Sequence, residues 1–157
     1  MTIVGIDLGL RSAYLASIDS DGMLDLDAIV LKPKKCSRDH ELSDIYLGVT
    51  QFILGQNQSK PISVRIEAPI VAGVRNLQTT IGIAQTSGAV LLACYGIPNE
   101  MVAVAQWKKA TVGKGNATKD DVARWLQRKH PIYFEQCAGD QNWIDATCIA
   151  LYGGQYA

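Results

Sequence analysis

The sequence predicts an α/β fold in which one mixed five-stranded sheet is flanked by helices. Short apolar segments near the N-terminus alternate with turn signals, as in an antiparallel meander. Later segments alternate between strand-like and helix-like apolar patterns, as in parallel strands joined by helical crossovers. The chain has 157 residues, 48% of them hydrophobic and 19% charged, which is typical of one globular domain. We therefore expect residues 1–157 to form a single domain.

The N-terminal part of the chain is expected to form three strands in an antiparallel meander. Ile3–Ile6 is an apolar run that ends at Asp7, and Tyr14–Ile18 is followed by the turn sequence DSDG. Met23–Leu31 alternates apolar and polar residues, as a strand with one buried face does. Asp7 lies where water or a metal ion can reach it, although such an aspartate often simply opens a turn. Gly9 would let a backbone or a phosphate approach that carboxylate closely.

A helix and a fourth strand are expected next. Apolar residues at helical spacing predict a helix that begins near Ser37 or Asp39 and ends at about Ile53. Ile62–Ile66 then alternates as a strand and delivers Glu67 at its end, shortly before a proline. Glu67 is thus a second carboxylate at a strand terminus. The alternative is a glutamate of an edge strand in water.

The C-terminal half is expected to add one strand and three helices. Leu77–Tyr95 is rich in small residues and predicts a closely packed helix, and Met101–Ala105 is expected as a fifth, buried strand. Thr118 and Asp121 have the spacing of a capping box, which predicts a helix after them. The GKG loop before this helix lacks the spacing of a nucleotide-binding P-loop. The last helix is expected to begin near Asp140.

The predicted topology would bring several carboxylates together. Strands one and four are natural neighbours in such a sheet, so Asp7 and Glu67 are expected side by side. A last helix on the same face would add Asp145, with Asp140 or Asn142 as a further contributor. A charged residue in a first helical turn often only complements the helix dipole, which is the alternative for Asp140. Grouped carboxylates raise one another's pKa values unless divalent cations neutralise them.

This donor set favours one kind of chemistry. Hard oxygen ligands select Mg²⁺ or Mn²⁺ rather than zinc. Two such ions can activate a water molecule and stabilise the leaving oxygen in phosphodiester hydrolysis. Both histidines, His40 and His130, lie in polar segments, so no histidine-activated nucleophile competes with this interpretation.

The charge distribution indicates a polyanionic partner. The formal net charge is zero, but the segment from Glu100 to His130 holds seven basic and three acidic residues. A basic zone beside an acidic pocket suits a polyanion that is bound by one surface and cut in another. The alternative is a solvated helix face of mixed charge.

The sequence also predicts a compartment. Four widely spaced cysteines form no CxxC pair, which favours reduced thiols in a cytoplasm over a zinc site. No apolar run approaches the roughly 20 residues of a membrane span, and no secretion signal is recognised at the N-terminus. We therefore expect a cytoplasmic protein without membrane contact.

Four segments, in this order, give the chain a family resemblance: GIDLGLRSA, IEAP, WKKATVGKGNATKDDV and DQNWIDATCIAL. Together they resemble the RuvC family of Holliday-junction resolvases over nearly the whole chain. That family has a ribonuclease H-like fold and acts as a homodimer. The resemblance implies that Asp7, Glu67 and Asp145 are metal ligands and that Lys108 and Lys119 contact DNA phosphates near the scissile bond. Further DNA contacts are expected from the same basic segment, at Lys109 and Lys114.

Two positions depart from the family pattern. The family commonly has an aspartate three residues before the last catalytic one, where this chain has Asn142. Asp140 would supply the missing charge, or the Asn142 amide oxygen would ligate more weakly. After Glu67 the bacterial enzymes place an aromatic residue that enters the junction centre. An aliphatic wedge can still separate base steps, so DNA contacts are expected here from Ile70, Val71 and Arg75.

The resulting hypothesis is a Mg²⁺-dependent, homodimeric endonuclease that resolves four-way junctions by paired symmetric nicks, with two ions per site and Mn²⁺ as a substitute. A two-fold dimer suits a two-fold junction, and Leu77–Tyr95 is the expected interface.

The shorter, variant pattern would fit a phage-type member. The alternatives are a broader nuclease for branched or flapped DNA and a junction-binding protein weakened in catalysis. IVGIDLG also resembles the phosphate loop of actin and Hsp70 ATPases, but 157 residues hold one lobe only, so no nucleotide cofactor is expected.

Overall fold

One five-stranded sheet forms the centre of the protein. The computed structural model describes residues 1–31, 37–56, 60–69 and 77–153. The strands lie in the order β3-β2-β1-β4-β5. Their bounds are β1 Thr2–Leu8, β2 Ser12–Ile18, β3 Leu24–Val30, β4 Ile62–Glu67 and β5 Asn99–Val102.

The directions of the strands confirm the predicted mixed sheet. β1 pairs with β2, and β2 with β3, in antiparallel fashion. β1 pairs in parallel with β4, so that Ile6 lies opposite Ile66, and β4 pairs in parallel with β5. The two strands that end in candidate carboxylates are therefore neighbours, and parallel strands bring their C-terminal ends to the same edge of a sheet.

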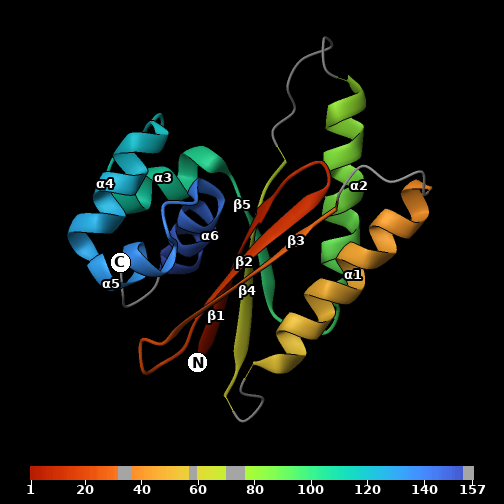
Figure 1. Cartoon of the computed structure of the whole chain (residues 1–157), viewed down its shortest axis with the longest axis horizontal. Helices are drawn as coiled ribbons and strands as arrows, with labels where there is room; N and C mark the ends of the chain where they lie inside the picture. The colour runs from red at the N-terminus through yellow and green to blue at the C-terminus, as the bar shows by residue number, and fades with distance from the viewer. Residues whose placement is uncertain (32–36, 57–59, 70–76, 154–157) are drawn as a thin grey trace.

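Helices cover both faces of the sheet (Figure 1). The helices α1 and α2 lie on one face, and α3 to α6 lie on the other. Their bounds are α1 Arg38–Gly55, α2 Leu77–Ala93, α3 Val104–Val112, α4 Lys119–Lys129, α5 Pro131–Gln136 and α6 Gln141–Leu151. None of the helices in the described ranges is both long and apolar enough to cross a membrane.

Strand alternation divides the core into two layers. In β1, Val4 and Ile6 point into the layer beneath α1 and α2, while Ile3 points into the layer beneath α6. Asp7 has the parity of Ile3 and therefore faces the α6 side. Each layer is built from fully buried aliphatic side chains, among them Ile45 and Ile144, so the helices that carry site residues are held firmly to the sheet.

Several local predictions are confirmed. Thr118 and Asp121 form the reciprocal hydrogen bonds of a capping box at the start of α4. The last helix, expected to begin near Asp140, begins at Gln141 with Asp140 at the N-cap position. The helix expected after Ser37 begins at Arg38, with Ser37 at the N-cap position.

The fifth strand differs from its prediction. β5 spans Asn99–Val102, and the chain is already helical from Val104, where α3 begins. β5 is also mostly exposed, with only Val102 buried, because it is the edge strand beside β4. The short apolar run VAVA is compatible with either a strand or a helix, and it is too short for its periodicity to distinguish between them. The short helices α3 and α5 were not predicted.

Candidate active site

Three carboxylates from separate elements meet at one end of the sheet. Asp7 is the penultimate residue of β1, and Glu67 is the last residue of β4. Asp145 lies one turn into α6, which packs on β1 and β2. All three side chains are half-buried. Asp7, Glu67 and Asp145, the three expected metal ligands, thus lie within electrostatic reach of one another.

A glycine determines how closely α6 approaches the sheet. A Cβ atom at Gly5 would overlap the carbonyl oxygen of Ala146 and the backbone nitrogen of Ala150. The backbone of α6 therefore lies directly on β1, which holds Asp145 on the side of Asp7. Gly9 was expected to allow such a close approach, but a Cβ atom at Gly9 would meet Ser12 of the same turn.

The electrostatics of the site show that the three carboxylates influence one another. The pKa of Asp7 rises from 3.8 to about 8, mainly because burial removes the carboxylate from water and then because Glu67 and Asp145 repel it. Burial is also the main cause of the raised pKa values of Glu67 and Asp145, and the charge of Asp145 raises the pKa of Glu67 further. The site therefore favours a bound cation or proton over three free negative charges.

Two hydrogen bonds hold the carboxylates in place. The indole Nε1 of Trp107 donates to Oε2 of Glu67 at 3.1 Å, and Nε2 of Gln141 donates to Oδ1 of Asp145 at 2.7 Å. Each bond occupies one oxygen and lowers the pKa of its carboxylate, against the larger effect of burial. Sequence reasoning missed both donors. A signal existed only for Gln141, which lies four residues before Asp145 and so on the same helix face.

The donor set fits a hard divalent cation. Within the described ranges, no group of three His, Cys, Asp or Glu side chains has the geometry to coordinate an ion by itself. Mg²⁺ does not require such a cage, because it usually retains waters and shares its coordination with substrate phosphates. Three half-buried carboxylates with raised pKa values supply the charge and the oxygen ligands that such an ion needs. The residues therefore fit the expected cofactor.

Asp140 and Asn142 occupy the start of α6 in different ways. Asp140 is the N-cap, and its Oδ1 accepts hydrogen bonds from the backbone N–H of Asn142 at 2.8 Å and of Trp143 at 3.4 Å. Burial is the main cause of the raised pKa of Cys137, and the charge of Asp140 adds to it. The pKa values of Asp7 and Asp145 are raised mainly by burial and are lowered in part by nearby lysines. The Oδ1 atom of Asp140 is thus engaged at the N-terminus of α6, where its charge also complements the helix dipole. Asn142 follows within the first turn.

Basic residues flank the carboxylates. The charges of Lys108 and Lys119 oppose the pKa shift of Asp145, which places both ammonium groups within electrostatic reach of it. Nζ of Lys108 donates to the carbonyl oxygen of Ala117 at 2.9 Å and so ties α3 to the residue before the α4 cap. Lys119, the first residue of α4, is exposed. Both positions suit contacts with phosphates beside the carboxylates.

The other proposed DNA contacts lie farther out or outside the described ranges. Lys109 is exposed on α3, and Lys114 pairs with Asp121 at 3.2 Å, which offsets part of its charge. Ile70, Val71 and Arg75 lie outside the residues that the structure describes.

An ion-pair network around the buried Glu41 supports the turn that follows Asp7. Glu41 pairs with Arg11 at 3.2 Å and with Arg38 at 3.0 Å, and its side chain is only 3% exposed. Arg38 also donates to Thr86, whose hydroxyl in turn donates to the carbonyl oxygen of Leu10 at 3.0 Å. The β1–β2 turn is therefore fixed to both α1 and α2 on the face opposite α6.

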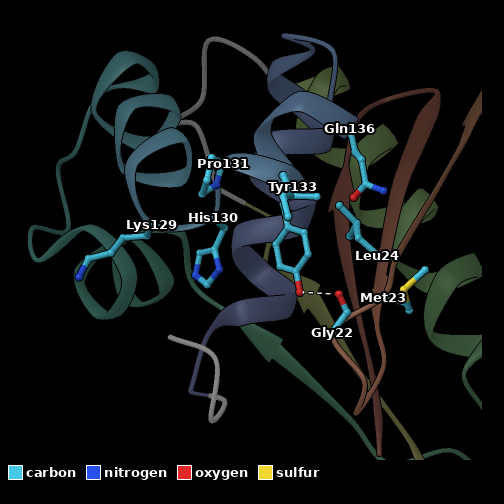
Figure 2. A pocket seen from close by; sticks show the side chains of 9 residues that line it. Gly22, Met23, Leu24, Lys129, His130, Pro131, Tyr133 and Gln136 are labelled. Atoms are coloured by element: carbon cyan, nitrogen blue, oxygen red, sulfur yellow. Dashed lines mark hydrogen bonds between the residues drawn. The ribbon is translucent and has the colours of Figure 1, made fainter.

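A separate hollow of about 450 Å³ lies at the other end of the sheet (Figure 2). Figure 2 shows Tyr133 of α5 reaching the β2–β3 turn, where its hydroxyl donates to the carbonyl oxygen of Gly22 at 2.8 Å. This turn follows Ile18, which pairs with Ile3 at the end of β1 remote from Asp7. The hollow is thus distinct from the carboxylate site. It is lined by Gly22, Met23, Leu24, Lys129, His130, Pro131, Ile132, Tyr133 and Gln136.

Comparisons with known proteins agree on one family. Residues 3–151 match the family model described as "Crossover junction endodeoxyribonuclease RuvC". The protein of that name from Paraburkholderia phytofirmans is 31% identical over 82% of this chain and 71% of its own length. The one from Chlorobium phaeovibrioides is 29% identical over 78% of this chain and 66% of its own length. This chain thus spans about two thirds of the curated relatives that it matches.

Solved structures confirm the predicted ribonuclease H-like fold. The chain superposes on Thermus thermophilus RuvC with a TM-score of 0.74 and 21% identity, covering 97% of this chain and 92% of that one. The same protein in complex with a Holliday junction substrate gives a TM-score of 0.73 at 22% identity, with the same coverage. The yeast mitochondrial Holliday junction resolvase gives 0.55 at 11% identity, covering 94% of this chain and 75% of that one.

Proposed function

Because the chain belongs to the RuvC family of crossover junction endodeoxyribonucleases, we propose that it resolves four-way (Holliday) DNA junctions by paired symmetric nicks. The observation that carries this proposal is the meeting of Asp7, Glu67 and Asp145 at one end of the sheet, flanked by Lys108 and Lys119. The carboxylates are the catalytic residues, and the two lysines contact DNA phosphates near the bond that is cut.

Nucleases of this family are metal-dependent, and Mg²⁺ is the proposed cofactor, with two ions per site and Mn²⁺ as a substitute. When bound, such ions supply the activation of water and the stabilisation of the leaving oxygen. Asp7, Glu67 and Asp145 would hold them. The indole of Trp107 and the amide of Gln141 orient two of these carboxylates. Asn142 would at most add an amide oxygen.

The proposed assembly is a homodimer, because two symmetric nicks need two active sites related by a two-fold axis. α2 is the proposed interface. It carries large apolar side chains that are exposed in the single chain: Leu77, Ile81, Leu91 and Leu92, with Tyr95 just beyond the helix. An exposed apolar face of this kind marks an interaction site. Residues 1–157 are proposed to form one nuclease domain, which acts in the cytoplasm, where it would reach its DNA.

One alternative has an observation in its favour. Asn142 stands where the family commonly has an aspartate, and Oδ1 of Asp140, the residue proposed to supply the missing charge, is engaged at the N-cap of α6. Loss of one carboxylate would favour a protein that binds junctions but cuts them weakly. The three remaining carboxylates, each with a raised pKa, favour the active enzyme.

The test is a cleavage assay with Mg²⁺ on a synthetic four-way junction, with linear duplex and flap substrates as controls. Wild type is compared with Asp7→Asn and with Asp44→Asn, a matched change at an exposed position on α1. We expect paired nicks in the junction alone, lost in Asp7→Asn and retained in Asp44→Asn. Equal cutting of all branched substrates would indicate the broader nuclease. Binding without cutting in Mg²⁺ and in Mn²⁺ would indicate the binding protein.

A further inference from the structure

We infer that Gln141 is a positioning residue, which fixes the orientation of Asp145 so that one carboxylate oxygen is presented to the cation. This inference rests on the proposed function, because it concerns the same metal site. Nε2 of Gln141 donates to Oδ1 of Asp145 at 2.7 Å, a short bond for an amide donor and a carboxylate. Both residues are half-buried, so water competes with this bond only in part.

The start of α6 is held in place, so the backbone of Gln141 has a fixed position. Asp140 caps the helix through the backbone N–H of Asn142 and of Trp143. The Trp143 indole donates to the carbonyl oxygen of Asp27 on β3 at 3.1 Å and packs edge-on against Tyr14 of β2, with ring centroids 6.1 Å apart. The first turn of α6 is thus tied to the sheet, so the Gln141 amide donates to Asp145 from a fixed backbone.

A held carboxylate is a better ligand than a mobile one. With Oδ1 engaged by Gln141, rotation of the Asp145 carboxylate is restricted, and Oδ2 is the oxygen left to meet an incoming ion. Without this bond, metal binding would have to immobilise the side chain at an entropic cost. Groups that orient metal ligands in this way typically change metal affinity or activity by roughly 10- to 100-fold when removed.

The neutrality of the donor matters as much as its position. A lysine or arginine at 141 would also hold Asp145, but its positive charge would repel the divalent ion that the carboxylates attract. An amide donates the same hydrogen bond without opposing the cation. Glu67 has a similar arrangement, since its Oε2 accepts from the neutral indole of Trp107. Neither of these two donors therefore adds a positive charge beside the carboxylates.

The experiment measures Mn²⁺ binding to the DNA-free protein by electron paramagnetic resonance, together with junction cleavage over a range of Mn²⁺ concentrations. Gln141→Met keeps the length of the side chain and removes the donor. Gln127→Met is the matched control, because Gln127 is exposed on α4. We expect Gln141→Met to weaken Mn²⁺ binding roughly 10-fold or more, and its cleavage to recover at high Mn²⁺. Junction affinity in EDTA and the thermal midpoint should stay as in the control.

The results separate this inference from the proposed function. Mn²⁺ affinity equal in Gln141→Met and Gln127→Met would overturn the positioning role, even if wild type cuts junctions. Cleavage lost without a change in Mn²⁺ affinity, or not recovered at high Mn²⁺, would overturn it as well. If Gln141→Met does not fold, Gln141→Ala against Gln127→Ala repeats the comparison with a good helix former. Failure of wild type to cut any junction would refute the proposed function, while the binding comparison would still decide the role of Gln141.

Discussion

The backbone of Gly5 in β1 lies against the carbonyl oxygen of Ala146 in α6, and no Cβ atom fits between them. Asp7 is two residues beyond Gly5 on the same face of the strand, and Asp145 immediately precedes Ala146. The contact between a glycine and a helix backbone therefore allows α6 to bring Asp145 close to the side of β1 that carries Asp7. Burial is the main cause of the raised pKa of Asp7, and the packing of α6 on β1 adds the repulsion of Asp145 to that of Glu67.

We predict that Gly5→Ala moves α6 away from β1 and impairs both folding and cleavage. The added methyl group would meet backbone atoms, which cannot rotate out of the way as a side chain can, so the free energy of unfolding should fall by about 1–3 kcal/mol or more. Urea denaturation measures this loss. Gly55→Ala is the control, since nothing lies within 4 Å of a Cβ atom there. Equal stability of the two variants would show that α6 does not need this contact.

The sequence was sufficient to predict a mixed five-stranded sheet and to place Asp7 and Glu67 at the ends of two neighbouring strands. Asp7 follows a continuous apolar run and Glu67 follows an alternating one. These runs form β1 and β4 in the structure. Their pairing followed from the order of the elements. The boundary between β5 and α3 was misplaced because a four-residue apolar run has no period long enough to separate strand from helix. The exposure of β5 depends on its place at the sheet edge, which local sequence does not encode.

The donors around the carboxylates could not be predicted in the same way. Trp107 reaches Glu67 across forty positions of sequence, so only the packed structure brings the two together. The choice between a cap and a ligand at Asp140 also depended on where its side chain points, because both roles occur at the start of a helix. Family resemblance identified the carboxylates but not the hydrogen bonds that orient them.

We predict that the metal-free protein loses stability as the pH rises from about 4 to about 8. The pKa of Asp7 is about 8 in the folded state and near 3.8 when exposed, so over this window the folded state holds a proton that the unfolded state has released. Glu67 and Asp145 shift in the same direction. Urea denaturation in EDTA at a series of pH values measures the slope.

The variant Asp7→Asn tests whether Asp7 causes this fall in the free energy of unfolding with pH. The amide cannot ionise, so the variant should show a flatter pH profile and should be more stable than wild type at pH 8 without metal, by roughly 1–3 kcal/mol. Adding Mg²⁺ at pH 8 should stabilise wild type more than the variant, because the ion binds the folded site. If the free energy of unfolding of the two proteins in EDTA changed with pH in the same way, Asp7 would not be the cause of the pH dependence.

We predict that Trp107→Phe lowers cleavage more than its effect on folding explains. The change removes the indole N–H that Glu67 accepts, so the carboxylate loses its orientation, and cleavage should fall roughly 10-fold. Trp125→Phe makes the same change in the same core layer, away from Glu67. Both variants should lose some stability through the smaller ring. Similar cleavage by the two variants, compared at equal folded fraction, would argue against a role for the Trp107 donor.

We predict that Lys119→Ala weakens junction binding and reduces its dependence on salt. Lys119 is exposed beside the carboxylates, where a phosphate neutralised by its charge would release counterions. The slope of log K against log salt should fall by about 1, with a similar loss for every junction sequence. Lys129→Ala is the control, because Lys129 ends α4 beside the remote hollow. Titrations in EDTA at several salt concentrations measure both slopes, and an unchanged slope for Lys119→Ala would place the DNA elsewhere on the protein.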